Sequence, residues 1–156
     1  MINICVPGGQ EYRLEHLVLD YNGTLACDGR ILAGVKEALR TLADQLEVHV
    51  VTAGTFGRAQ SELQGVPCRL CIVSAEGQDA AKLAYVRDLG GDRTACIGNG
   101  RIDRLMLKEA ALGIVVVQGE GAAVEALLAA DVVCPDILSA LGLLLHPRRL
   151  IATLRS

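Results

Sequence analysis

The sequence predicts an α/β fold, a three-layer, Rossmann-like domain in which a parallel sheet carries helices on both faces. Short apolar runs of strand length alternate along the chain with segments whose apolar residues recur at helical spacing. The connections are short, and right-handed crossovers between parallel strands place helices on either side of the sheet. Residues 1–156 have the size of a single domain with one core.

The N-terminal half begins with a predicted β-hairpin. Apolar and polar residues alternate on either side of Pro7-Gly8-Gly9, and the second arm, Tyr12 to His16, leads into a buried strand at 17–19. A loop at 21–31 separates this strand from a helix. That helix is predicted from apolar residues at helical spacing, and the next segment, 48–52, has the pattern of a strand. The helix-defining residues are Val35, Leu39, Leu42 and Leu46.

Helices and strands continue to alternate as far as the C-terminus. Helices are predicted near 58–64, 78–89, 103–111 and 122–129, and after Pro135 and Pro147. The second of them is ended by Gly90-Gly91. Strands are predicted at 69–73, 94–97, 113–117 and 131–133.

Composition indicates an aliphatic core and argues against a membrane or nucleic-acid partner. Hydrophobic residues make up 51% of the chain and aromatic residues 3%. Charges interrupt every apolar run before the roughly 20 residues that a membrane-spanning helix needs. A net charge of −3 provides no concentrated basic face for nucleic acid. The N-terminus lacks the basic start and long apolar stretch of a secretion signal, so we expect a cytoplasmic protein.

The cysteines and histidines give no clear metal motif. In a cytoplasmic protein the six cysteines are expected to be reduced. Cys68 and Cys71 form the only tight pair, but a structural zinc site would need two further ligands, and none lies nearby in the sequence. His16, His49 and His146 are scattered along the chain, so we expect core or surface roles for them.

An acidic residue ends the first buried strand. Asp20 follows Leu17-Val18-Leu19, and a glycine-containing loop follows Asp20. Ligands of parallel α/β sheets bind at the carboxyl ends of the strands, where loops and helix N-termini direct backbone N–H groups into a cleft. Asp20 is therefore the first candidate for a nucleophile or metal ligand.

Residues 20–25, Asp-Tyr-Asn-Gly-Thr-Leu, resemble the first motif of the haloacid dehalogenase superfamily, usually DxDx[TV]. Three further segments resemble its other motifs in the expected order: Thr52 after an apolar strand, Lys82, and the stretch Gly98-Asn99-Gly100-Arg101-Ile102-Asp103. The stretch from Lys82 onward looks most like the phosphorylation domain of P-type ATPases. The resemblance therefore implies a soluble, P-type-ATPase-like phosphatase that depends on Mg²⁺.

The resemblance also implies a role for each matched residue. Asp20 would be the nucleophile that forms an aspartyl-phosphate, and Lys82 would keep it ionised and stabilise the transition state. Thr52 would hydrogen-bond a phosphoryl oxygen. Mg²⁺ would be held by Asp20, the backbone carbonyl of Asn22 and the side chain of Asn99, with Asp103 beside or behind them. The substrate phosphate would also contact the loops that contain Tyr21, Gly23, Thr24, Ala53 and Gly54.

Two residues depart from the superfamily pattern. Asn22 stands where an acid–base Asp is usual, and an amide cannot exchange a proton as a carboxyl group does, so turnover is expected to fall by about 10²- to 10⁴-fold. Asn99 replaces another Asp and brings no charge, so Mg²⁺ should bind more weakly. P-type ATPases also lack the second acid in their DKTGT motif and still form the aspartyl-phosphate. Two functions stay open: a slow phosphatase, and a catalytically weakened module that binds a phosphorylated ligand or partner.

No separate cap domain is predicted, because the segments between Thr24, Thr52 and Lys82 are filled by the expected helices and strands. An uncapped site suits a bulky or macromolecular phosphorylated substrate, or a lid from another subunit, so self-association into a homo-oligomer is expected.

The motif residues also have purely structural interpretations. Lys82 fits the exposed face of an amphipathic helix, and Asp103 fits the N-cap of the helix that starts at Arg104. A dinucleotide-binding loop is disfavoured, because Gly98-x-Gly100 lacks the third glycine. A phosphoacceptor receiver domain is disfavoured, because no acidic pair ends an early strand.

Overall fold

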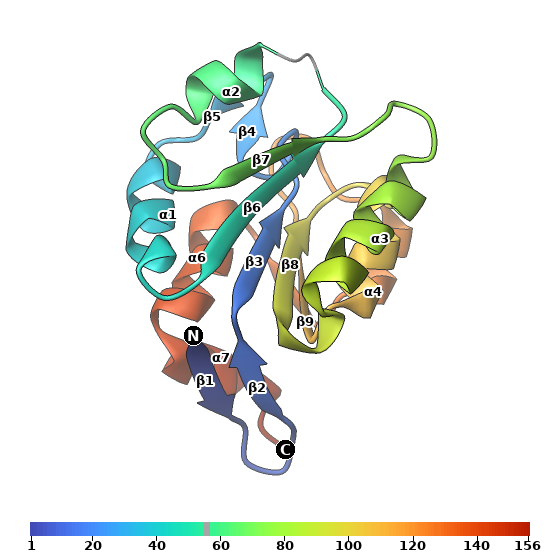
Figure 1. Cartoon of the computed structure of the whole chain (residues 1–156). Coiled ribbons are helices and arrows are strands. Elements are labelled where there is room, and N and C mark those ends of the chain that lie inside the picture. The colour runs from blue at the N-terminus through green and yellow to red at the C-terminus, as the bar shows by residue number, and fades with distance from the viewer. Residues whose placement is uncertain (55–56) are drawn as a thin grey trace.

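A computed structural model describes residues 1–54 and 57–156 and has a central parallel sheet between two layers of helices (Figure 1). The sheet has six strands in the order β10-β9-β8-β3-β6-β7, and each neighbouring pair is parallel. The strands are β3 (His16–Leu19), β6 (Glu47–Thr52), β7 (Arg69–Ile72), β8 (Thr94–Gly98), β9 (Leu112–Val116) and β10 (Val132–Cys134). The predicted fold class is confirmed.

The helices divide between the two faces of the sheet because successive strand residues point to opposite sides. Leu17 and Leu19 lie in a core cluster with residues of α1, α6 and α7, whereas Val18 lies in a second cluster with residues of α3, α4 and α5. The helices are α1 (Val35–Ala43), α2 (Arg58–Glu62), α3 (Gln78–Leu89), α4 (Arg104–Glu109), α5 (Val124–Ala129), α6 (Ile137–Leu145) and α7 (Pro147–Leu154). Two 3₁₀ turns, η1 (Gly91–Arg93) and η2 (Arg101–Asp103), flank β8.

The predicted N-terminal hairpin is present as β1 (Ile2–Cys5) and β2 (Glu11–Leu14), an antiparallel pair that leads into β3 without joining the six-stranded sheet. The hairpin lies near the C-terminus, at the end of the molecule away from the carboxyl ends of β3 and β6 (Figure 1).

The expected loop at 21–31 contains a second, short antiparallel hairpin, β4 (Ala26–Cys27) and β5 (Arg30–Ile31). The prediction of a loop is therefore wrong for the residues of these two strands. Its turn is Asp28-Gly29, and both residues have positive φ, at 51° and 79°. Asp-Gly is a preferred pair for a two-residue hairpin turn of this kind, so the signal was present in the sequence.

The expected helix at 35–46 is shorter than its apolar spacing suggests. It ends at Ala43, and Leu46 lies beyond it, buried in the turn before β6. Cys68 and Cys71 pack into different core clusters, on opposite faces of the sheet, so they do not form a chelating pair. Among the described residues no single helix is long and apolar enough to cross a membrane; α6 and α7 reach that length only together, with a 100° bend between them.

Candidate active site

The carboxyl ends of β3, β6 and β8 bring three of the four motifs to one edge of the sheet. Leu19 pairs with Val50 on one side and with Ile97 on the other. Asp20 therefore leaves the sheet between the ends of two neighbouring strands, and its backbone N–H donates to the carbonyl of Ile97. Thr52 ends β6, and Asn99 directly follows β8.

Lys82 reaches inward from α3 and joins two carboxylates. Its Nζ lies 2.6 Å from Oδ1 of Asp20 and 2.7 Å from Oδ1 of Asp103. The Lys82 side chain is 0% exposed, and Asp20 and Asp103 are also buried. The prediction that Lys82 places a cation beside Asp20 is confirmed, and the alternative of a surface lysine is wrong.

The charges in this buried set do not balance, because two carboxylates share one ammonium group. Burial and the charge of Asp103 raise the pKa of Asp20 to about 7, although Lys82 acts to lower it. Burial also disfavours the charged form of Lys82, but both carboxylates outweigh that effect and its pKa is raised, so the ammonium group stays charged. A cation beside Asp20 would offset the excess negative charge. The electrostatics of the site therefore fit a metal ion.

Thr24 and Asn99 place further oxygen atoms around Asp20. The Thr24 hydroxyl lies 3.3 Å from Oδ2 of Asp20 and 3.2 Å from Oδ1 of Asn99. The Asn99 Nδ2 donates to the carbonyl of Gly121 at 3.0 Å, which turns its Oδ1 toward Thr24. Carboxylate and amide oxygens are ligands that Mg²⁺ accepts. Both the oxygen atoms around Asp20 and the excess negative charge of the site therefore suit a magnesium ion.

Asp103 supports both Lys82 and the loop after β8. Its Oδ1 accepts from Lys82, and its Oδ2 accepts from the backbone N–H groups of Asn99 and Gly100 at 3.1 and 2.9 Å. Asp103 occupies the predicted N-cap position of α4, but among the described residues its side chain makes no capping hydrogen bond to that helix and is instead bound to Lys82 and the loop. Both carboxylate oxygens of Asp103 are therefore hydrogen-bonded, and the Lys82 ammonium group lies between Asp103 and Asp20.

The predicted phosphate-contacting residues lie along the two loops at this edge. Thr52 is buried, whereas Ala53 and Gly54 are half-buried. The Tyr21 hydroxyl donates to the carbonyl of Gly29 in the β4–β5 turn at 2.8 Å, so that side chain anchors the hairpin. The Asn22 side chain is exposed.

Gln118 was not predicted, yet it holds the loop after Asp20 in place. Its Nε2 donates to the carbonyls of Gly23 and Thr24 at 3.1 and 2.6 Å, and its Oε1 accepts from the N–H of Ile137 at 2.9 Å. No motif marks this residue. Its place just after the strand β9, at the same edge of the sheet, is the signal that could have found it.

Sequence comparison links the chain to an archaeal protein. The uncharacterized protein MJ0073 of Methanocaldococcus jannaschii is 44% identical over 79 residues, which are 48% of this chain and 85% of MJ0073. This chain belongs to the MJ0073 family. No family model matches the sequence.

Structure comparison relates this member of the MJ0073 family to solved phosphatases. The 3-deoxy-D-manno-octulosonate 8-phosphate phosphatase of Moraxella catarrhalis, solved with magnesium, phosphate and KDO, has a TM-score of 0.72 and 14% identity over 92% of this chain and 94% of its own. A phosphatase of the HAD superfamily from Bacteroides thetaiotaomicron has a TM-score of 0.62 and 13% identity over 93% and 97% of the two chains. The fold is therefore that of the haloacid dehalogenase superfamily.

Gly23 is required by the geometry of the loop that follows Asp20. Its φ is +78°, and a Cβ at this position would lie 2.4 Å from Nδ2 of Asn99. We expect Gly23→Ala to lower the free energy of unfolding by about 1–3 kcal/mol through backbone strain, and in addition to displace the Asn99 amide. Chemical denaturation and magnesium titration of the variant measure these two effects.

Gly77→Ala is the matched control for this change. Gly77 also has a positive φ, +67°, but a Cβ there would have no neighbour within 4 Å among residues 1–54 and 57–156. It should reproduce the strain without altering the response to magnesium. Equal magnesium titrations for the two variants would contradict the proposed contact between the loop and Asn99.

Proposed function

We propose that the chain is a Mg²⁺-dependent phosphohydrolase that works through an aspartyl-phosphate at Asp20, and that it is slow because Asn22 stands in place of an acid–base Asp. One observation carries the proposal: the buried contact of Asp20 with Lys82, backed by Asp103, at the carboxyl end of β3. The magnesium and phosphate bound to the Moraxella phosphatase of the same fold support it.

In the first step a carboxylate oxygen of Asp20 attacks the phosphorus atom of a phosphate ester. The bond between phosphorus and the ester oxygen breaks, and the leaving alkoxide takes the electron pair. Lys82 stabilises the negative charge on the phosphoryl oxygens, and Thr52 and the backbone N–H groups of the 21–23 loop donate hydrogen bonds to them. In the second step water attacks phosphorus, and the Asp20 carboxylate is released with inorganic phosphate.

Both steps need a proton transfer that position 22 does not catalyse. The leaving alkoxide must gain a proton, and the attacking water must lose one. The Asn22 amide can do neither, so bulk water has to exchange these protons. The exposure of Asn22 fits this role, because solvent reaches the mouth of the site there. The result is a slow enzyme rather than an inert one.

Asp20, Asn99 and the backbone carbonyl of Asn22 would hold the magnesium ion. Its chemical contribution would be to neutralise charge between two anions, the carboxylate and the phosphate, that must meet. Thr24 keeps the side-chain oxygens of Asp20 and Asn99 close together, and Gly121 fixes the direction of the Asn99 amide. Because Asn99 brings no charge, the ion should bind more weakly than at a site with a second carboxylate there.

The substrate class that fits is a phosphate monoester whose alcohol part projects into solvent. Among the described residues, the β4–β5 hairpin lies between Asp20 and α1, and α2 and β7 lie between Thr52 and α3, which fits a site without a separate cap domain. We propose a bulky phosphorylated substrate, or a lid provided by a second copy of the chain. The proposed location is the cytoplasm.

Trapping of Asp20 tests the proposal directly. The protein should hydrolyse a generic aryl phosphate slowly, only with magnesium, and should form a beryllofluoride adduct at Asp20 that is detected by mass spectrometry or ¹⁹F NMR. Asp20→Asn should abolish both. Asp28→Asn, the same change in the exposed turn of the β4–β5 hairpin, should abolish neither, because Asn tolerates the positive φ of that position. Adduct formation without turnover would favour the phospho-ligand-binding module.

A further inference from the structure

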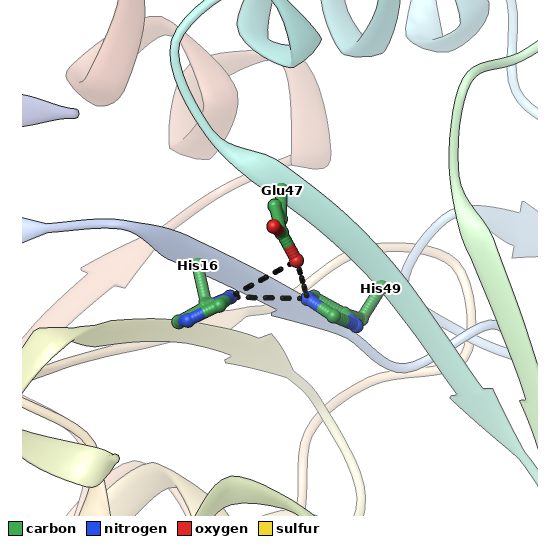
Figure 2. Close-up of side chains that lie close together, drawn as sticks. All are labelled: His16, Glu47 and His49. Carbon is green, nitrogen blue, oxygen red and sulfur yellow. Dashed lines mark hydrogen bonds and ion pairs between the residues drawn. The ribbon is translucent and has the colours of Figure 1, made fainter. Parts of the chain in front are cut away.

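Three potential metal ligands gather at the amino ends of β3 and β6, at the opposite end of these strands from Asp20. Figure 2 shows His16, Glu47 and His49 with their nitrogen and oxygen atoms pointing toward one another. The parallel register pairs His16 with Glu47 and Val18 with His49, so all three side chains lie on the same face of the sheet. His16 and His49, which are far apart in the sequence, are therefore neighbours in the sheet.

The spacing of the ligand atoms matches one face of a zinc tetrahedron. Nδ1 of His16 lies 3.2 Å from Nε2 of His49, and Oε2 of Glu47 lies 3.7 and 3.8 Å from these two nitrogens. Zinc–ligand bonds of about 2.0–2.2 Å at tetrahedral angles separate neighbouring ligands by roughly 3.3–3.6 Å. One ion can therefore contact all three atoms after shifts of a few tenths of an ångström.

Tyr85 on α3 orients one of the imidazoles as a metal site requires. Its hydroxyl lies 2.9 Å from Nδ1 of His49, and the His49 side chain is 0% exposed. If His49 carries its proton on Nδ1, the Tyr85 oxygen accepts it and the lone pair of Nε2 faces His16. Hydrogen bonding of the second ring nitrogen in this way is usual for ligating histidines. Burial lowers the pKa of His49 to about 4, with a smaller contribution from the nearby His16, so the ring is neutral.

We propose that His16, Glu47 and His49 form a binding site for Zn²⁺ or a similar borderline divalent cation, with the fourth position open to solvent. Two imidazoles and one carboxylate are a ligand set that zinc accepts with water in the remaining position. The site is separate from the magnesium site. Asp20 lies four residues beyond His16 along β3, a span of roughly 13 Å at the usual rise of a strand.

A cation already lies at the edge of this cluster. Nη2 of Arg69 is 3.7 Å from Oε2 of Glu47, and the Arg69 side chain is 73% exposed. The guanidinium group would compete with a metal ion for the Glu47 carboxylate. Its exposure lets it swing away into solvent when the ion binds. Removal of the Arg69 guanidinium group should therefore favour metal binding. The same removal would weaken the cluster if hydrogen bonds and ion pairs alone held it together.

The test is the binding of zinc alone to the full chain in the Asp20→Asn background, which removes the Asp20 carboxylate as a competing ligand. We expect one equivalent of Zn²⁺ by calorimetry, and the intense visible absorption of tetrahedral Co²⁺ when cobalt replaces zinc. Loss of an outer hydrogen-bond partner lowers affinity by about 10- to 100-fold at metal sites, so Tyr85→Phe should fall in that range. His16→Ala and Glu47→Gln remove direct ligands and should lower affinity by more than about 100-fold.

Two controls separate a metal site from a structural cluster. His146→Ala removes an exposed histidine elsewhere and should leave zinc binding unchanged. Arg69→Gln should keep or strengthen it. His16→Ala and Glu47→Gln alter partly or largely exposed side chains, so circular dichroism should show intact folding. No stoichiometric zinc binding, or binding that survives His16→Ala, would overturn the proposal and leave a hydrogen-bonded pair of histidines.

Discussion

Asn22→Asp should raise the rate of magnesium-dependent aryl phosphate hydrolysis by about 10²- to 10⁴-fold, the usual contribution of general acid–base catalysis. The new carboxyl group would stand two residues after Asp20, where it can protonate the leaving alcohol and then accept a proton from the attacking water. The Asn22 side chain is exposed, so the substitution disturbs no packing. Steady-state kinetics with and without magnesium measure the gain.

Asn3→Asp is the matched control for this gain. Asn3 is also exposed but lies on β1, away from the active site, so the same chemical change there should leave the rate unaltered. An Asn22→Asp protein that folds, forms the Asp20 adduct and shows no faster turnover would contradict the slow-enzyme proposal. In that case the site would be better described as a receptor for phosphorylated ligands.

Lys82→Met should both inactivate and destabilise the protein. Methionine keeps an unbranched apolar stem but lacks the terminal ammonium group, which leaves Asp20 and Asp103 buried without their cation. Breaking a buried ion pair in this way costs about 3–5 kcal/mol in the free energy of unfolding. Loss of one group that stabilises transition-state charge lowers turnover by about 10²- to 10³-fold. Denaturant titration and steady-state kinetics measure the two losses.

The stability loss in Lys82→Met should depend on pH in a defined direction. The pKa of Asp20 is about 7 with Lys82 present, and Lys82 acts to lower it, so removal of Lys82 raises it further. Protonation of Asp20 relieves its repulsion with Asp103, so the loss should be smaller in mildly acidic buffer than in mildly alkaline buffer. Lys108→Met, at an exposed lysine of α4, should show neither the loss nor the pH dependence. Equal losses at both pH values would contradict the proposed charge imbalance.

The alternation of helices and strands was enough to predict the fold, because hydrophobic period distinguishes the two kinds of element locally. The main omission was the β4–β5 hairpin. Its strands have two residues each, too few for an alternating pattern, and only the Asp28-Gly29 turn signals it. The end of α1 was also misplaced, because Leu46 is buried by the following turn and continues the helical spacing by coincidence.

Some residues of the candidate site can be found from the local sequence, whereas others are defined by contacts between distant parts of the chain. Asp20, Thr52 and Asn99 were found because they follow apolar strands, and Lys82 was found from its place in the order of the resembling motifs. Gln118 was missed because its partners are backbone carbonyls about 95 positions away in the sequence, which no local pattern encodes. The pairing of His16 with His49 was missed for a related reason. It depends on the register of β3 against β6, and register is decided by the whole sheet.

Because of the Gly121 carbonyl, Asn99 is harder to replace by aspartate than Asn22 is. At Asn22 an aspartate can be introduced alone, since solvent surrounds the side chain. At Asn99 an aspartate would set a carboxylate oxygen against the Gly121 carbonyl, where the amide now donates a hydrogen bond. Restoring the superfamily's acidic pair is therefore an epistatic problem: one substitution is accessible in a single step, and the other first requires the 118–121 turn to be redirected.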